Sequence, residues 1–138
     1  MDKNLEKIKV IFLDLDGTIY LGGNLIDGVL EFLERCDSKG IKKFFLSNNS
    51  SKSVSEYVVK LKSLGIHANE NDVLLSTHDL ISWLGKEGIN ETYLVGTEGM
   101  RSMLEESGVN TQSEKPQYVV LGYDTEINYE KLTKATIH

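Results

Sequence analysis

Short apolar runs alternate along the chain with longer segments in which apolar residues recur every three or four positions. The runs are rich in β-branched and aromatic side chains, which is typical of buried strands. They are Val10–Leu13, Phe44–Leu46, Val73–Leu75, Tyr93–Val95 and Tyr118–Leu121. We therefore predict a strand at each run and expect the first strand to be buried on both faces.

The segments between the runs predict amphipathic helices, because their apolar residues share one helix face and several of the segments are followed by glycine. Ser53 and Glu56 have the spacing of a capping box, in which each side chain accepts a hydrogen bond from the other residue's amide. Helices are expected over residues 29–36, 54–64, 79–86 and 98–107 and from Asn128 onward.

Strand and helix alternate throughout, and this order is the signature of an α/β protein. Strands joined by a helix lie parallel, with a right-handed crossover. The predicted fold class is a Rossmann-like parallel sheet with helices on both faces.

Polar side chains follow the first two predicted strands where each strand ends. They are Asp14, Asp16, Gly17 and Thr18 after the first, and Ser47, Asn48 and Asn49 after the second. Parallel strands present their carboxyl ends at one edge of a sheet, so these groups are expected to meet there around a phosphate. Each carboxylate would repel a phosphate by about 4 kcal/mol at ~4 Å and an effective dielectric of ~20. Mg²⁺, which prefers hard oxygen ligands, would offset that repulsion.

The segment Asp14-Leu15-Asp16-Gly17-Thr18-Ile19-Tyr20 resembles the first motif of the haloacid dehalogenase (HAD) superfamily of phosphatases. Residues 44–50 resemble its second motif, in the branch of p-nitrophenylphosphatases, phosphoglycolate phosphatases and nucleotide monophosphatases that carry a large α/β cap. Later segments, at 93–96, 119–124 and 128–132, are similar to parts of that cap. The resemblance implies the amino-terminal half of a HAD-like catalytic core over residues 1–77 and the first part of the cap over residues 78–138.

The resemblance also implies an enzyme, a Mg²⁺-dependent phosphoric monoester hydrolase acting on a small phosphorylated metabolite. It makes Asp14 the nucleophile that forms an aspartyl-phosphate, and Asp16 the general acid and base. Mg²⁺ would be held by the Asp14 carboxylate and the Asp16 backbone carbonyl. Gly17, Ser47 and Asn48 would bind the phosphoryl group.

The same resemblance calls for a third-motif lysine and fourth-motif acidic residues after the cap. Lys115-Pro116 and Gly122-Tyr123-Asp124 look similar to these motifs, but each matches the cap pattern in its own place. We therefore expect the chain to be an amino-terminal fragment, inactive alone if nothing replaces the missing groups. The strand Val10–Leu13 would then have an unpaired edge, which predicts a homodimer or other self-association.

The composition and net charge limit the classes of partner that we expect for this protein. Fifteen Lys and Arg residues against 21 Asp and Glu give a net charge of −6, which disfavours nucleic acid and anionic membranes. No apolar run approaches the ~20 residues that span a bilayer. The single cysteine, Cys36, excludes an intramolecular disulfide and favours a cytoplasmic location.

Two other functions stay open. One is a non-catalytic module that binds phosphate or a partner protein. The other is a receiver-type signalling domain, which is disfavoured because Ser76 and Thr77, not an aspartate, follow the third strand. Among the remaining residues, Cys36, Trp83, Met100 and Met103 are expected in the core, and His67 and His78 are expected to be solvated or to cap helices.

Overall fold

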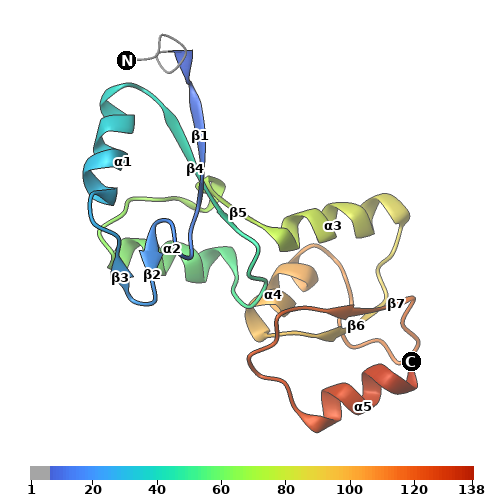
Figure 1. Ribbon diagram of the computed structural model, residues 1–138. Coiled ribbons are helices and arrows are strands. Elements are labelled where there is room, and N and C mark those ends of the chain that lie inside the picture. The colour runs from blue at the N-terminus through green and yellow to red at the C-terminus, as the bar shows by residue number, and fades with distance from the viewer. Residues whose placement is uncertain (1–6) are drawn as a thin grey trace. The chain divides into compact units, whose positions relative to one another are not determined.

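The computed structural model describes residues 7–138. Strands and helices alternate along this part of the chain (Figure 1). The strands are β1 (Val10–Asp14), β2 (Tyr20–Leu21), β3 (Asn24–Leu25), β4 (Lys42–Ser47), β5 (Val73–Leu75), β6 (Thr92–Val95) and β7 (Tyr118–Leu121). The helices are α1 (Val29–Ser38), α2 (Val54–Ser63), α3 (Ser76–Glu87), α4 (Glu98–Glu106) and α5 (Tyr129–Ile137), with a short 3₁₀ turn at Glu70–Asp72.

The chain forms two compact units. The first runs to Ser47 and resumes over Tyr57–Leu74, and the second comprises Asn48–Glu56 and Leu75–His138. The larger sheet has the order β1-β4-β5, and a separate parallel pair, β6-β7, lies in the second unit. The predicted α/β fold with parallel strands is confirmed, and every predicted strand and helix is present.

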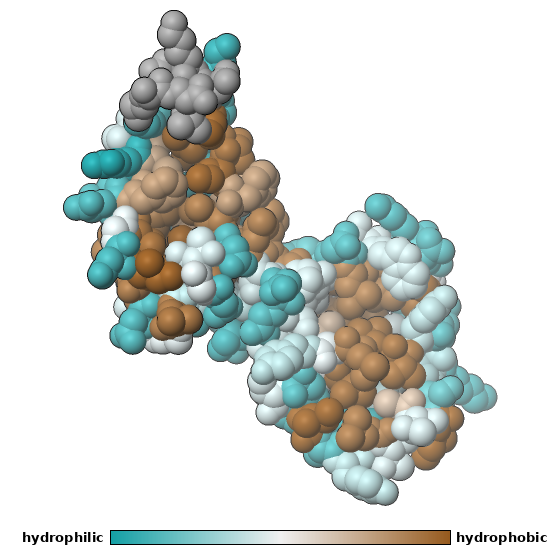
Figure 2. All heavy atoms as spheres, viewed as in Figure 1, coloured by the Kyte–Doolittle hydropathy of each residue, from teal (hydrophilic) through white to brown (hydrophobic). Residues whose placement is uncertain are grey.

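Strands β1 and β4 are parallel, and their register runs from Val10 opposite Lys42 to Asp14 opposite Leu46. One face of β1 is covered, since Leu13 is only 8% exposed. On the other face Val10 and Phe12 are 43% and 58% exposed, and hydrophobic surface of the first unit is visible in Figure 2. The expectation that this strand is buried on both faces is therefore wrong. A continuous apolar run predicts two covered faces, but the described residues cover only one.

Local signals at the helix ends act as the sequence predicts. Gly40 adopts a left-handed φ of 65° after α1, and the Ile41 amide donates to the Cys36 carbonyl at 2.9 Å. Before α2 the capping box is confirmed, because the Ser53 amide donates to Glu56 Oε2 at 2.7 Å and the Glu56 amide donates to Ser53 Oγ at 3.3 Å. Across the described residues, no helix combines the length and apolar character needed to cross a bilayer.

The second unit has its own hydrophobic core, made of Leu84, Ile89, Leu94, Met100, Leu104, Val109 and Val120. Met100 and Met103 are buried, as is Cys36 in the first unit, so these packing predictions are confirmed. Trp83 is different, because it is 42% exposed and lies edge-on against Tyr118, with 5.6 Å between ring centroids. It stands at the margin of the α3 face that Leu84 anchors, which explains why the core prediction fails there.

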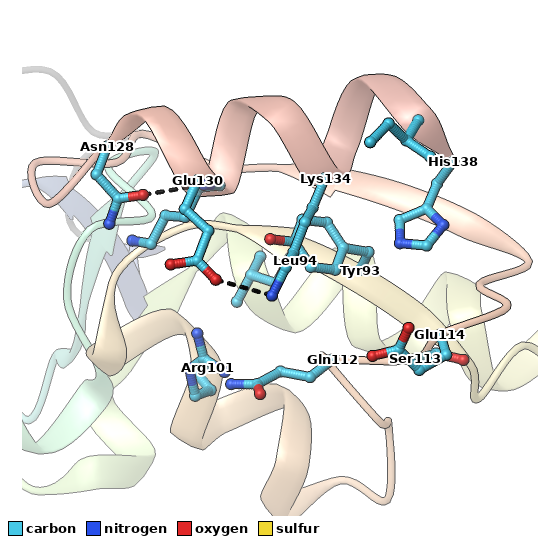
Figure 3. A pocket seen from close by; sticks show the side chains of 12 residues that line it. Tyr93, Leu94, Arg101, Gln112, Ser113, Glu114, Asn128, Glu130, Lys134 and His138 are labelled. Atoms are coloured by element: carbon cyan, nitrogen blue, oxygen red, sulfur yellow. Dashed lines mark hydrogen bonds and ion pairs between the residues drawn. The ribbon is translucent and has the colours of Figure 1, made fainter.

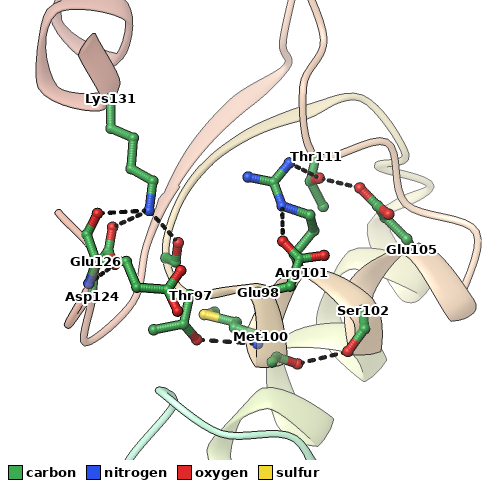
Figure 4. A network of polar contacts seen from close by, with 12 residues as sticks. Thr97, Glu98, Met100, Arg101, Ser102, Glu105, Thr111, Asp124, Glu126 and Lys131 are labelled. Atoms are coloured by element: carbon green, nitrogen blue, oxygen red, sulfur yellow. Dashed lines mark hydrogen bonds and ion pairs between the residues drawn. The ribbon is translucent and has the colours of Figure 1, made fainter. Parts of the chain in front are cut away.

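A partly buried ion pair links α5 to the segment after β7. Lys131 Nζ donates to Asp124 Oδ2 at 2.8 Å, to the Gly96 carbonyl at 2.8 Å and to the Glu126 carbonyl at 3.3 Å (Figure 4). The side chain of Asp124 is only 2% exposed. All three ammonium hydrogens are used, so the charge of Asp124 is compensated inside the second unit.

Replacing Lys131 with methionine should destabilise the second unit strongly. The substitution leaves the Asp124 carboxylate buried without its cation, and breaking such a pair costs about 3 kcal/mol or more. Lys134→Met is the matched control, because Lys134 pairs with Glu130 on the exposed side of the same helix. Chemical denaturation followed by circular dichroism should show a lower midpoint for Lys131→Met and an unchanged midpoint for the control; equal midpoints would contradict the assignment.

Candidate active site

The two predicted polar clusters begin at neighbouring strand ends in the first unit. Asp14 is the last residue of β1 and lies opposite Leu46, the residue before Ser47. The Leu15 amide extends the ladder by donating to the Leu46 carbonyl at 3.1 Å. Asp14 and Ser47 therefore lie at the same carboxyl edge, and this expected juxtaposition is confirmed.

A tight turn follows Asp14. The carbonyl of the fully buried Leu15 accepts the Ile19 amide at 2.9 Å, and the Gly17 amide donates to the Tyr20 carbonyl at 2.8 Å. Gly17 has a φ of 86°, in the left-handed region that residues with a Cβ rarely adopt. The glycine thus allows the turn, while its own amide is used within the loop.

The turn leaves the side chains of Asp14 and Asp16 exposed. Thr18 Oγ1 donates to Asp14 Oδ2 at 3.3 Å. Carboxylate and carbonyl oxygens are the hard donors that Mg²⁺ prefers, so the residues present fit this ion. Within residues 7–138, no group of three or more His, Cys, Asp or Glu side chains is placed to hold a metal.

Ser47 and Asn48 have different surroundings although they are consecutive. Ser47 is 6% exposed, and its hydroxyl lies 2.9 Å from the Tyr57 hydroxyl of α2. Asn48 is exposed, begins the second unit and accepts a hydrogen bond at its carbonyl from Ser76 Oγ at 3.2 Å. The first unit thus holds Asp14, Asp16, Gly17 and Ser47, and Asn48 is the first residue of the second unit.

The sequence pattern does not predict that two tyrosines, Tyr20 and Tyr57, lie beside these residues. Tyr57 falls on the apolar face of a predicted helix, and the pattern gives no sign of its hydroxyl contact. Tyr20 begins the β2–β3 hairpin, which the pattern predicts only as a glycine-containing loop. The Tyr20 hydroxyl is buried and lies near the carboxylate of Asp16. Burial and then the charge of Asp16 raise the pKa of Tyr20 above its usual range.

The loop that follows Ser47 is fixed to other parts of the second unit. Thr97 Oγ1 donates to the Ser51 carbonyl at 2.7 Å, and the Tyr123 amide donates to Ser50 Oγ at 2.8 Å. Gly99 approaches the loop so closely that a Cβ on it would lie 2.8 Å from the Ser53 amide nitrogen. The second-motif loop therefore rests on a contact that only glycine permits.

Gly99→Ala should destabilise the second unit by about 1–3 kcal/mol, because the added methyl group forces the Ser53 backbone to move. Gly85→Ala is the matched control. Gly85 lies within α3 and a Cβ there meets nothing within 4 Å. The control should gain about 0.5–1 kcal/mol from helix propensity. Thermal unfolding of both variants measures the difference, and a Gly99→Ala protein as stable as the control would refute the close contact.

The remaining residues that the sequence singles out also have defined surroundings. Asp124, in the segment similar to a fourth motif, forms an ion pair with Lys131. His78 is exposed and caps α3, since its Nδ1 accepts the Leu75 amide at 3.0 Å, and His67 is exposed; both histidine predictions are confirmed.

An open pocket of about 410 Å³ lies in the second unit between α5 and the segment around Gln112 (Figure 3). Arg101, Lys134 and Glu130 contribute charges of both signs to its wall. A hydrogen bond from Lys134 to Glu130, at 2.8 Å, lowers the pKa of the Glu130 carboxyl and raises that of Lys134. The whole lining has three cationic side chains, Arg101, Lys131 and Lys134, and two carboxylates, Glu114 and Glu130.

The fold and this edge define a class: an α/β protein in which polar side chains gather at the carboxyl ends of parallel strands. The sequence profile of haloacid dehalogenase-like hydrolases matches residues 11–110. The chain belongs to this family, and the resemblance found in its first two motifs is confirmed.

Relatives and solved structures agree with this assignment. The acid sugar phosphatase of Staphylococcus haemolyticus is 34% identical over 135 residues, which cover 96% of this chain and 51% of the relative. The structure of 4-nitrophenylphosphatase from Thermotoga maritima has a TM-score of 0.89 at 37% identity, covering 96% of this chain and 51% of that one. Glycerol phosphate phosphatase from Mycobacterium tuberculosis, solved in complex with magnesium, has a TM-score of 0.83 at 26% identity, covering 96% and 41%. The chain spans about half the length of the curated relatives it matches.

Proposed function

We propose that the protein carrying this chain hydrolyses small phosphomonoesters with Mg²⁺ through an aspartyl-phosphate. The observation that supports this most is the β1–β4 register, which puts Asp14 beside Ser47 at the carboxyl edge in a chain of this family. The names of the relatives favour a sugar or polyol phosphate as the substrate.

In the proposed reaction a carboxylate oxygen of Asp14 attacks phosphorus while the bond to the leaving alcohol oxygen breaks. Asp16 donates a proton to that oxygen, so the alcohol departs neutral. Asp16 then takes a proton from water as the water oxygen attacks the phosphorus of the aspartyl-phosphate. Inorganic phosphate leaves and the Asp14 carboxylate is restored.

The other site residues bind rather than react. The Ser47 hydroxyl and the Asn48 side-chain amide donate to phosphoryl oxygens, and Gly17 shapes the loop around the phosphate, because its own amide is bonded to Tyr20. The Asp14 carboxylate and the Asp16 backbone carbonyl would hold Mg²⁺, which supplies charge neutralisation when bound. In this proposal residues 1–77 belong to the catalytic core, residues 78–138 belong to the cap, and the location is cytoplasmic.

A second candidate is a module that binds phosphate or a partner without turning substrate over. It is favoured for residues 1–138 taken alone, which contain no counterpart to the third-motif lysine or the fourth-motif acids that the resemblance calls for. We further propose that isolated copies associate through β1, whose Val10 and Phe12 are exposed. Light scattering should then show a mass above one chain at high concentration, and a monodisperse monomer would count against it.

Hydrolysis of p-nitrophenyl phosphate by the purified protein that carries this chain, with Mg²⁺ and after chelation, tests the proposed function. We expect nitrophenolate release that stops on chelation and returns when Mg²⁺ is added back. Nitrophenolate release that continues at the same rate after chelation would overturn the metal requirement. Saturable phosphate binding without any turnover would favour the binding module.

A further inference from the structure

Thr97 joins the second-motif loop, residues 48–56, to the turn between β6 and α4 within the second unit. Its Oγ1 atom donates to the Ser51 carbonyl at 2.7 Å and accepts the Met100 amide at 3.3 Å, as the cap of α4 (Figure 4). Thr97 is only 2% exposed. A carbonyl oxygen can only accept and an amide can only donate, so the direction of both hydrogen bonds is fixed.

Two further hydrogen bonds hold the same loop within the second unit. The Tyr123 amide donates to Ser50 Oγ at 2.8 Å, and Ser76 Oγ donates to the Asn48 carbonyl at 3.2 Å. The hydrogen bond from Thr97 is the shortest of the three and is partly buried, whereas the other two lie at exposed positions. Water competes for exposed donors and acceptors, so Thr97 holds the loop most firmly.

The held segment carries one of the proposed phosphate-binding residues. Asn48 precedes Ser51 by three positions, so fixing the Ser51 carbonyl restricts the backbone that leads to Asn48. When only a fraction of a protein is in its binding conformation, its apparent Kd rises by the inverse of that fraction. A residue that raises this fraction therefore strengthens phosphate binding without touching phosphate.

We propose that Thr97 is a positioning residue whose hydroxyl holds the second-motif loop in the conformation in which Asn48 donates to phosphate. This inference rests on the proposed function, in which the Asn48 side-chain amide contacts the phosphoryl group. Thr97 itself touches no reacting atom. Because the same oxygen caps α4, the experiment has to separate the two roles.

Titration with inorganic phosphate in the presence of Mg²⁺, using the purified protein that carries this chain, tests the proposal. Thr97→Val keeps the shape of the side chain and should raise the Kd of phosphate about fivefold, the effect of losing one neutral hydrogen bond. Thr97→Ser keeps the hydroxyl and should bind phosphate nearly as well as the wild type. An unchanged Kd in Thr97→Val would overturn the proposal.

Two variants in the same unit control for lost stability. Thr92→Val removes a buried hydroxyl that donates to the Asn110 carbonyl at 2.9 Å, outside the second-motif loop. Asn128→Ala removes the side chain that caps α5 by accepting the Lys131 amide at 2.9 Å. Both variants should be less stable than the wild type and bind phosphate with the wild-type Kd. A fivefold loss of affinity in either control would show that lower stability alone weakens binding, against the proposal.

Amide hydrogen exchange needs no phosphate and reports the loop directly. In Thr97→Val the amides of Ser53 and Tyr123, which are hydrogen-bonded to side chains of the loop, should exchange faster than in the wild type. In Thr92→Val they should keep their wild-type rates. Faster exchange at Met100 without any change in the loop would mean that Thr97 only caps α4, which would overturn the proposal. If the wild type binds no phosphate, the proposed function fails, and the exchange rates still decide whether Thr97 fixes the loop.

Discussion

Asp14→Asn lowers p-nitrophenyl phosphate hydrolysis by about a thousandfold or more, because it replaces the attacking carboxylate with an amide that is a poor nucleophile. The change is nearly isosteric, and Asp14 is exposed at the end of β1, so folding should be unaffected. Steady-state release of nitrophenolate measures the effect, and circular dichroism checks that the fold persists.

Asp79→Asn supplies the matched control for Asp14→Asn. Asp79 is exposed in the first turn of α3 and has no part in the proposed chemistry. The control should keep wild-type activity, and a loss seen only in Asp14→Asn then shows that the activity does not come from a contaminating phosphatase. An Asp14→Asn protein that retains a substantial fraction of the wild-type rate would remove Asp14 from the role of nucleophile.

Asp16→Asn should separate the two halves of the reaction. Steady-state turnover is expected to fall by about 10²–10⁴, the usual contribution of a general acid or base. The nitrophenolate ion is a weak base and leaves with little help from an acid, so the first half should survive. Hydrolysis of the aspartyl-phosphate still needs a base. Rapid mixing should therefore show a burst of one nitrophenolate per active site, followed by slow turnover.

An alkyl phosphate sharpens this prediction. An alkoxide is a strong base that needs a proton to leave, so with a sugar or polyol phosphate the Asp16→Asn protein should show no burst. A burst of equal size with both substrates would argue that Asp16 does not act as the acid. Unchanged steady-state turnover would argue that it acts as neither acid nor base.

Much of the fold follows from local sequence patterns. Apolar runs locate the longer strands, and glycines such as Gly40, whose φ is 65°, end helices where the sequence predicts. The capping box of Ser53 and Glu56 could be predicted because both partners lie within one turn. The exposure of one face of β1 could not be predicted, because a continuous apolar run does not show which face of the strand other residues cover.

The candidate site could also be predicted only in part. Asp14 and Ser47 could be placed together, since parallel strands bring their carboxyl ends to one edge. The contact between Ser47 and Tyr57 could not be predicted, because it joins a strand end to a helix face through tertiary packing. The hairpin that begins at Tyr20 could not be predicted either, since each of its strands has only two residues. That length is too short for any period to show.

The central claim is that Asp14 carries the phosphoryl group during the reaction. It is tested most directly by quenching the Asp16→Asn protein in acid while it reacts with p-nitrophenyl phosphate and mapping its peptides by mass spectrometry. We predict one phosphoryl group, on the peptide that contains Asp14, which appears only with Mg²⁺ and is absent when Asp14 is also replaced by Asn. A phosphoryl group on another residue, or nitrophenolate release with no phosphorylated peptide, would contradict the account.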